Sequence, residues 1–153
     1  MVKFLLIIIG LSNLSLAIVT SIDQIATDSQ TKLQWQDEVY LESEGIAENK
    51  EIEEGKALNW ENAIKYCENL TLGGKDDWRL PNKYELVSIV DYNESSSSTI
   101  IDGFINSSND RFWTSTSVYN KSDILYIILF GVGVIITESK SNVCLVRCVR
   151  GGL

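Results

Sequence analysis

The chain of 153 residues contains no histidine and only one proline, Pro81. Without histidine, the sequence lacks the commonest general base, the usual catalytic triads and most zinc sites. It also lacks a glycine-rich phosphate-binding loop, which argues against a nucleotide-binding domain. An uncharged stretch at residues 124–136 has 13 residues, too few to cross a bilayer as a helix.

Basic side chains are outnumbered by acidic ones, 13 against 21, which gives a formal net charge of −8. This excess argues against nucleic acid, sulfated polysaccharides or anionic membranes as electrostatic partners. Residues 37–56, called the acidic segment below, hold eight acids and two lysines. We expect this segment to be a solvated surface loop. Its acids lack the alternation and the turn glycine of a calcium-binding hand, so we expect no metal and no cofactor.

The N-terminus has the pattern of a secretory signal peptide. Lys3 precedes an apolar stretch at residues 4–11, and small residues precede an expected cleavage site after Ala17. The apolar stretch is too short for ~30 Å of hydrocarbon, which favours a cleaved leader over a membrane anchor. The sequence therefore predicts a leader at residues 1–17 and one exported domain at residues 18–153. We expect that domain to be secreted, periplasmic or on the cell surface, without membrane insertion after cleavage.

Residue patterns predict short strands, then two helices, then further strands, which is an α+β order. Residues 22–38 have the alternation of two short strands around a polar turn at 27–31. Residues 58–72 have the apolar spacing of a helix, with Asn59 as its N-cap and the glycine pair 73–74 as its end.

A second helix is expected to begin at Asn82, where Glu85 completes a capping box, and to end near Asp91. Leu86, Ile89 and Val90 supply its buried face. The rest of the chain is expected to form a polar loop at 92–98, an irregular segment at 100–109, a strand at 111–116, a buried hairpin at 124–137 and a last strand at 143–150.

The three cysteines suggest one disulfide. Cys67 lies in the first predicted helix, whereas Cys144 and Cys148 lie in the last predicted strand. Export favours a disulfide, but four strand residues at ~3.3 Å each separate Cα atoms by roughly 13 Å, about twice the disulfide limit. One of these two is therefore expected to pair with Cys67. The other is either a small buried hydrophobic residue or a reactive thiol, a metal ligand or an intermolecular bridge.

The densest set of special residues is Gly74-Lys75-Asp76-Asp77-Trp78-Arg79-Leu80-Pro81, called the central signature below, which is followed by Glu85-Leu86. Further motifs occur in order along the chain: residues 31–36, Trp60, Ala63 and Cys67, residues 112–116, Phe130-Gly131 and residues 146–152. Together they resemble the Lcl C-terminal domain family, an exported bacterial domain long of unknown function and named from a collagen-like surface adhesin. The resemblance covers nearly all of residues 18–153, although Lys32 replaces a usual glycine and Cys144 is extra.

The resemblance implies a C-type-lectin-like α+β fold, related in shape to formylglycine-generating enzymes, with two helices packed on short antiparallel sheets. It also implies that Cys67 pairs with Cys148, because such folds join the first helix to the last strand; Cys144 is then the free thiol. The adhesin that names the family binds sulfated glycans, which the net charge of this chain would repel. The Glu-Pro-Asn and Trp-Asn-Asp motifs of sugar-binding C-type lectins are absent.

Two interpretations compete for the motif residues. Trp78 and Leu80 fit the core, with Arg79 paired to a carboxylate or to backbone carbonyls. In the functional interpretation a ligand groove runs along the motifs, and an aromatic ring beside hydroxyls suits a sugar. The candidate binding residues are Trp113, Thr114, Ser115, Thr116, Arg79 and Asp77. The indole of Trp113 is equally a candidate for the core.

The sequence thus predicts a non-catalytic exported binding domain for a glycan or a protein at a cell surface. One alternative is a structural subunit of an envelope assembly, linked through Cys144. A less favoured alternative is a thiol enzyme that resembles the formylglycine-generating group and binds copper through Cys144 and Cys148. The spacing of these two cysteines and the need for Cys148 in the disulfide argue against it. The patterns predict no particular oligomeric state.

Overall fold

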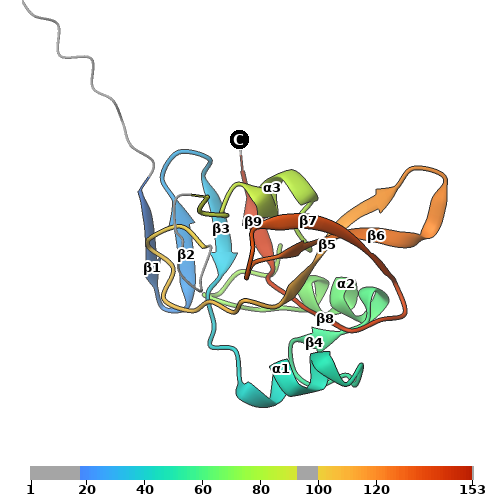
Figure 1. Cartoon of the computed structure of the whole chain (residues 1–153). Helices are drawn as coiled ribbons and strands as arrows, with labels where there is room; N and C mark the ends of the chain where they lie inside the picture. Colours follow the sequence, from blue (N-terminus) through green and yellow to red (C-terminus); the bar gives the residue numbers. More distant parts are fainter. Residues whose placement is uncertain (1–17, 93–99, 153) are drawn as a thin grey trace, which may run out of the picture.

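The computed structural model describes residues 18–92 and 100–152. Within them the chain forms three short helices and two sheets (Figure 1). The predicted α+β class is therefore confirmed. The predicted leader, and the predicted polar loop beyond Tyr92, lie outside the described residues.

The first sheet joins the start of the described chain to its end. Its strands, in spatial order, are β1 (Val19–Ile22), β2 (Ile25–Asp28), β3 (Leu33–Gln36) and β9 (Val149–Gly151). All neighbours are antiparallel, and Trp35 of β3 lies opposite Val149 of β9. The two strands predicted within residues 22–38 are β2 and β3, whereas β1 was not predicted.

The second sheet is larger and of mixed direction. Its spatial order is β4 (Ala57–Leu58), β8 (Cys144–Leu145), β5 (Arg111–Val118), β6 (Lys121–Leu129) and β7 (Val134–Ser139). Only β5 and β8 run parallel among the described pairs. The predicted strand at 111–116 and the hairpin are confirmed. The expected burial of the hairpin is wrong for β7, whose residues are half-exposed or exposed along its length.

The predicted last strand, residues 143–150, is divided in two. The chain leaves the second sheet after Leu145 and joins the first sheet at Val149. Between them, Arg147 is turned into the core, where it is only 1 % exposed. A continuous strand would hold both ends in one sheet, so the bend is what connects the two sheets.

Helix α2 (Trp60–Glu68) begins as predicted, with the Asn59 side chain accepting the Asn62 N–H at 3.0 Å. It ends at Glu68, with Asn69 as its C-cap, earlier than expected. The glycine pair forms a tight turn instead, in which Leu72 and Lys75 exchange two backbone hydrogen bonds of 3.1 Å. Gly73 and Gly74 have φ of +59° and +68°, the left-handed conformation that a two-residue hairpin turn requires.

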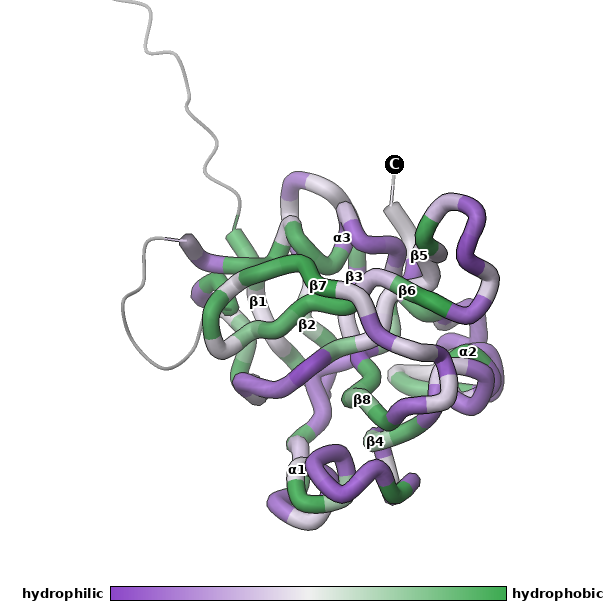
Figure 2. The backbone as a smooth tube through the Cα atoms, turned by 45° about the vertical axis from the view of Figure 1, so that its right-hand side comes forward, coloured by the Kyte–Doolittle hydropathy of each residue, from purple (hydrophilic) through white to green (hydrophobic). Residues whose placement is uncertain are grey.

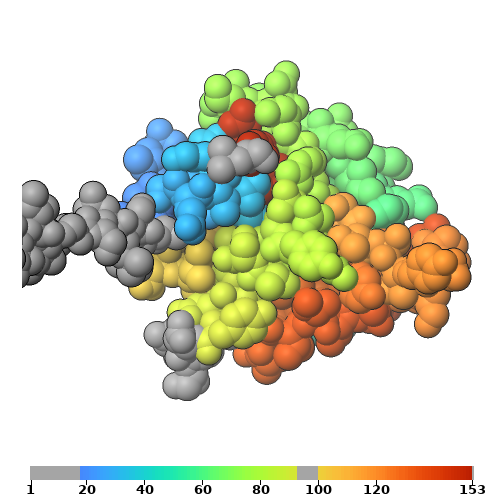
Figure 3. All heavy atoms as spheres, turned by 90° about the horizontal axis from the view of Figure 1, so that it is seen from above, coloured from blue at the N-terminus to red at the C-terminus, as the bar shows by residue number. Residues whose placement is uncertain are grey.

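Helix α3 (Lys83–Val87) begins with the predicted capping box. The Asn82 side chain accepts the N–H groups of Tyr84 and Glu85, and the Glu85 carboxylate accepts the Asn82 N–H at 2.8 Å. The helix ends at Val87, short of the predicted Asp91. In Figure 3 the yellow-green residues, which include α3, run across the middle of one face between the blue N-terminal strands and the orange β5–β6 residues.

Helix α1 (Glu42–Asn49) lies in the acidic segment, so the expectation of a solvated loop is wrong. Glu44, Ala47 and Glu48 are buried at helical spacing. The Glu44 carboxylate accepts the N–H groups of Leu41 at 2.8 Å and Lys56 at 2.7 Å, and forms an ion pair with Lys56 Nζ at 3.2 Å. These partners offset the cost of burying the Glu44 charge. The number of acidic residues in the segment does not show that such partners exist.

Two apolar clusters hold the layers together. One includes Trp35, Phe112 and Leu145, and the other surrounds Trp78 and Trp113. In Figure 2 the hydrophobic colouring continues along β6 and β7 toward the margin of the molecule. No helix in the described part of the chain is long and apolar enough to cross a membrane.

Candidate functional site

The central signature connects the two sheets. Arg79 and Val149 exchange two backbone hydrogen bonds of 2.9 Å, which add the signature to the edge formed by β9. On the other side, the Pro81 carbonyl accepts the Ser115 N–H of β5 at 2.7 Å. Trp78 and Leu80 are 2 % and 4 % exposed, as the core interpretation expects. The signature therefore has a structural role.

The charged residues of the signature form two surface ion pairs. Arg79 binds the Glu85 carboxylate with two hydrogen bonds of 2.8 and 2.6 Å, and Arg150 binds Asp77. The hydrogen bond from Arg150 lowers the pKa of Asp77. Burial would raise the pKa of Glu85, but hydrogen bonds from Arg79 and from the Asn82 N–H lower it. Both pairs fasten the signature to its neighbours.

The predicted aromatic-hydroxyl face is not on the surface. Trp113 and Thr114 are 0 % exposed. The indole N–H of Trp113 donates to the Leu58 carbonyl at 2.7 Å, and the Thr114 hydroxyl donates to the Tyr126 carbonyl at 2.6 Å. These two side chains offer no surface to a ligand in this structure, so the core interpretation of Trp113 holds.

The remaining two candidates lie beside the signature. Ser115 is exposed, whereas Thr116 is half-buried and its hydroxyl accepts the Lys83 N–H at 3.0 Å. Thr116 thus supports the start of α3. The six predicted residues therefore do not line one groove. Two lie in the core, two form surface ion pairs, one supports the start of α3, and Ser115 is a separate exposed side chain.

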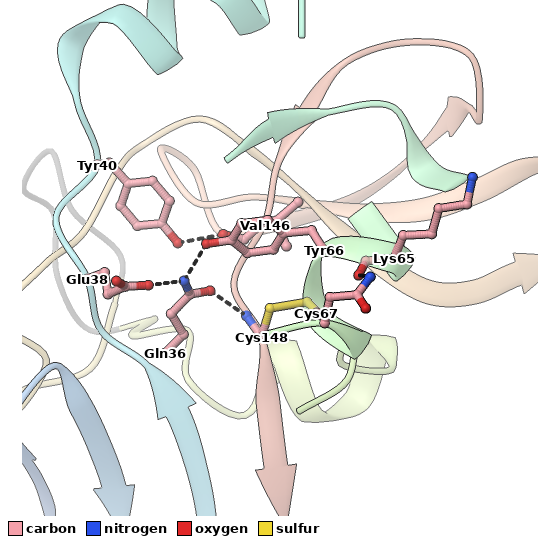
Figure 4. The surroundings of a disulfide bond; sticks show 9 residues. Gln36, Glu38, Tyr40, Lys65, Tyr66, Cys67, Val146 and Cys148 are labelled. Atoms are coloured by element: carbon pink, nitrogen blue, oxygen red, sulfur yellow. Dashed lines mark hydrogen bonds between the residues drawn. A yellow bond between two sulfur atoms is a disulfide. The ribbon is translucent and has the colours of Figure 1, made fainter. Parts of the chain in front are cut away.

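The disulfide implied by the family resemblance is present. Cys67 of α2 and Cys148 are bonded, with Cα atoms 5.5 Å apart. Figure 4 shows the Gln36 side chain beside the disulfide. The side-chain oxygen accepts the Cys148 N–H at 3.2 Å, and the side-chain NH₂ group donates to the Tyr66 hydroxyl at 2.8 Å. The bond joins α2 to the bend that connects the two sheets.

The third cysteine, Cys144, is a free thiol with 0 % exposure. Burial raises its pKa, although the nearby Arg111 guanidinium acts in the opposite direction. The thiolate is the reactive form of cysteine. Both accessibility and ionisation therefore disfavour reaction at this sulfur.

We expect Cys144 to be unreactive toward an aromatic disulfide reagent in the native protein. Unfolding without reductant should release one thiol per chain, and unfolding with reductant three, because Cys67 and Cys148 are bonded. A Ser141→Cys variant, with its thiol at an exposed position, is the matched control and should react in the native state. Rapid native labelling of the parent protein would contradict the burial of Cys144.

Arg111 gathers three carboxylates where α1 meets the second sheet. It forms ion pairs with Glu48, with Glu51 at 3.1 Å and with Glu138 at 2.9 Å. Burial raises the pKa of Glu48, even though the hydrogen bond from Arg111 lowers it. One guanidinium cannot neutralise three carboxylates, so this region remains negative.

A groove of about 450 Å³ runs beside α1. Leu41 and Ile46 flank it and are 58 % and 48 % exposed. Ser108 and Asp110 form the facing side, and Glu42 adds a second carboxylate. Apolar side chains next to carboxylates can hold a ligand that is both apolar and positively charged.

The base of the groove is rigid. Buried Leu145 contributes to it, and Tyr40 packs edge-on against Phe112 at 5.4 Å between ring centroids. The Tyr40 hydroxyl donates to the Val146 carbonyl at 2.9 Å. A preformed base reduces the ordering cost of binding.

Sequence reasoning missed this groove. One available signal was the presence of Val39, Leu41, Ile46 and Ile52 among the acids, since a solvated loop has no need for apolar side chains. The facing side comes from residues more than 60 positions later in the chain, and nothing in the sequence links them. Among the described residues, no group of three or more His, Cys, Asp and Glu side chains is arranged to hold a metal ion.

The structure thus defines a small α+β domain in which the central signature bridges two sheets and a disulfide joins α2 to the bend between them. Residues 24–150 match the Lcl C-terminal domain family. The match spans most of the sequence, so the chain belongs to this family, as the motifs had suggested. No curated protein matches the chain.

Proposed function

We propose that this chain is an exported, non-catalytic binding domain whose groove beside α1 holds a basic segment of another protein. The groove combines exposed Leu41 and Ile46 with the carboxylates of Glu42 and Asp110, and this combination is the observation that carries the proposal. Export is supported by the leader pattern at residues 1–17 and by the disulfide.

Charge favours a basic ligand. The chain has a formal net charge of −8, and Arg111 beside Asp110 is already engaged by three carboxylates. A lysine or arginine side chain of a partner would meet the carboxylates of the groove rim, and its apolar neighbours would cover Leu41 and Ile46. Long-range attraction would also speed encounter with a basic partner.

The groove suits a peptide better than a sugar. Sugar sites of the kind expected from the sequence need an exposed aromatic face, but Trp35, Trp78 and Trp113 are at most 2 % exposed. The exposed tyrosine rings, Tyr84, Tyr92 and Tyr119, do not line the groove. The Trp60 indole N–H is bonded to the Thr114 carbonyl at 3.0 Å. Aliphatic and carboxylate side chains instead fit an amphipathic basic segment.

The test uses fluorescent ten-residue peptides of alternating leucine and lysine, with leucine–glutamate and serine-only peptides for comparison. Anisotropy should show binding of the lysine peptide alone, and affinity should fall as salt rises, because the attracting charges are exposed. Glu42→Lys should weaken binding by about tenfold, roughly 1.4 kcal/mol. Ile46→Ser should also weaken it, by removing apolar contact.

Glu68→Lys is the matched control, because it changes the net charge equally at an exposed position of α2 away from the groove. It should reduce affinity far less than Glu42→Lys. Equal losses of peptide affinity in both variants would mean that the peptide binds through general electrostatic attraction and not in the groove, which would contradict the proposal. Tight binding to heparin-like chains in a parallel assay would contradict the charge argument.

The alternatives from the sequence meet structural obstacles. An intermolecular bridge through Cys144 would need an accessible sulfur, and that residue is fully buried. A copper site made of Cys144 and Cys148 would need two free thiols, and Cys148 is bonded to Cys67. Absence of catalytic turnover stays a prediction.

A further inference from the structure

Strand β7 is an open sheet edge. It is the last strand in the order β4-β8-β5-β6-β7, and no described strand pairs with its outer side. Its first three residues, Val134, Ile135 and Ile136, are 42 %, 44 % and 38 % exposed. Exposed edges of this kind present unpaired N–H and C=O groups that can pair with another strand.

Both faces of β7 are apolar over its first three residues. Ile136 lies opposite Ile127, and Ile135 lies opposite Ile128, so the two side chains of β7 point to opposite faces of the sheet. Their partners in β6 are 0 % exposed and belong to different apolar clusters. The strand therefore extends both core layers to the margin of the molecule. Figure 2 shows the hydrophobic colouring of the first part of β7.

Charge narrows the choice of partner. No residue from 131 to 137 is charged, although the chain as a whole has a net charge of −8. Repulsion between two copies of an acidic protein is smallest where the contact surface itself carries no charge. The other described edge strands of the two sheets are shorter: β1 has four residues, β4 has two, and β9 has three and is already paired with Arg79.

We propose that β7 pairs antiparallel with β7 of a second copy, which joins two five-stranded sheets into one across a two-fold axis at Ile135. An isologous contact of this kind is self-complementary. Ile135 then faces Ile135 of the second copy on one face of the sheet, and Ile136 faces Val134 on the other, so each face gains an apolar cross-strand pair. In this register Glu138 lies opposite Val132, so no like charges face each other.

The contact is small. Six strand residues extend about 20 Å, which places the interface at the low end of the range for weak, transient association. We therefore expect a concentration-dependent dimer. Two acidic copies repel, so added salt should strengthen the dimer, whereas salt should weaken peptide binding in the groove. The opposite salt responses distinguish failure of this proposal from failure of the proposed function.

Sedimentation velocity over a range of protein concentrations tests the proposal, with the chain from residue 18 onward. The parent protein should shift from monomer to dimer, and Ile135→Lys should raise the dimer dissociation constant at least about tenfold. Ile105→Lys, at a side chain that is 74 % exposed elsewhere, is the matched control and should leave it unchanged. A parent protein that stays monomeric at every concentration overturns the proposal.

Cross-linking gives a second measurement that does not depend on disrupting the strand. Ile135→Cys lies at the two-fold axis and should form an interchain disulfide under mild oxidation. Val132→Cys is also exposed, at 63 % for the native side chain, but it would lie about 20 Å from its counterpart in the antiparallel pair. Efficient linking through position 132 and not through 135 would overturn the register and the proposal with it.

Discussion

Replacement of Asp37 by alanine is expected to lower the free energy of unfolding by about 3–5 kcal/mol, because it leaves a buried arginine without its counter-ion. Asp37 and Arg147 are 0 % and 1 % exposed. The guanidinium donates to the Asp37 carboxylate at 3.3 Å, and that carboxylate also accepts the N–H groups of Ile105 at 2.8 Å and Asn106 at 3.0 Å. The variant removes all of these acceptors at once.

Urea denaturation without reductant measures this effect. Asp76→Ala, which removes the same side chain from an exposed position, should change stability by no more than about 0.5 kcal/mol. Combining Asp37→Ala with Arg147→Met should recover part of the loss, because the double variant no longer buries an unpaired charge. Recovery should be incomplete, since the N–H groups of residues 105 and 106 remain unpaired. A loss below about 1 kcal/mol in the single variant would contradict the role of Asp37 as the counter-ion of Arg147.

The aromatic environment explains why an arginine is tolerated at the bend between the sheets. The Arg147 guanidinium lies 5.3 Å from the Tyr40 ring centroid, 4.9 Å from that of Phe104 and 6.0 Å from that of Phe112. A planar, weakly hydrated cation packs well among aromatic faces. Arg147 therefore joins Tyr40, at the base of the groove, to Phe104, which precedes the side of the groove that faces α1.

Local signals were sufficient for much of the fold. Asn59 and Asn82 cap helices because the hydrogen-bonding groups involved lie within three residues of one another. The alternation around Leu33 and Trp35 identified strand β3, because that pattern is also contained within a few consecutive residues. Element ends were less accurate: the glycine pair 73–74 suits a helix end and a hairpin turn equally, and the choice depends on the pairing of Leu72 with Lys75.

Long-range partners account for the errors. The acids of α1 were assigned to solvent because Lys56 and Arg111, which neutralise Glu44 and Glu48, are identifiable only in the folded chain. The last strand was drawn as continuous because the place of Arg147 depends on Asp37, 110 residues earlier. The same limit applies to the groove.

A binding site centred on Trp113 is a reasonable prediction from the sequence, because an indole beside hydroxyls suits both a sugar site and a core. The residues that surround the ring decide between a sugar site and a core position. Trp113 packs in the cluster that includes Trp78, Leu125 and Ile127, and its N–H has a partner in the Leu58 carbonyl. These neighbours come from three separate segments of the chain: the one at Leu58, the central signature and strand β6.

Trp113→Ala is therefore expected to destabilise the domain by about 3–5 kcal/mol through lost burial and the cavity that remains. Tyr119→Ala, which removes an aromatic ring that is 87 % exposed, is the matched control and should change stability by no more than about 0.5 kcal/mol. Both variants are compared with the parent in urea denaturation. Comparison of the two variants thus separates the effect of burial on stability from the effect of removing an aromatic ring.

Binding gives the complementary measurement. Trp113 does not line the groove, so peptide affinity per folded molecule should be unchanged in Trp113→Ala when the folded fraction is taken into account. Lower apparent binding should follow the unfolded population alone, and conditions that restore folding should restore it. A Trp113→Ala protein that is as stable as the parent but no longer binds its ligand would place the ring at a contact surface and return the site to the motif at residues 113–116.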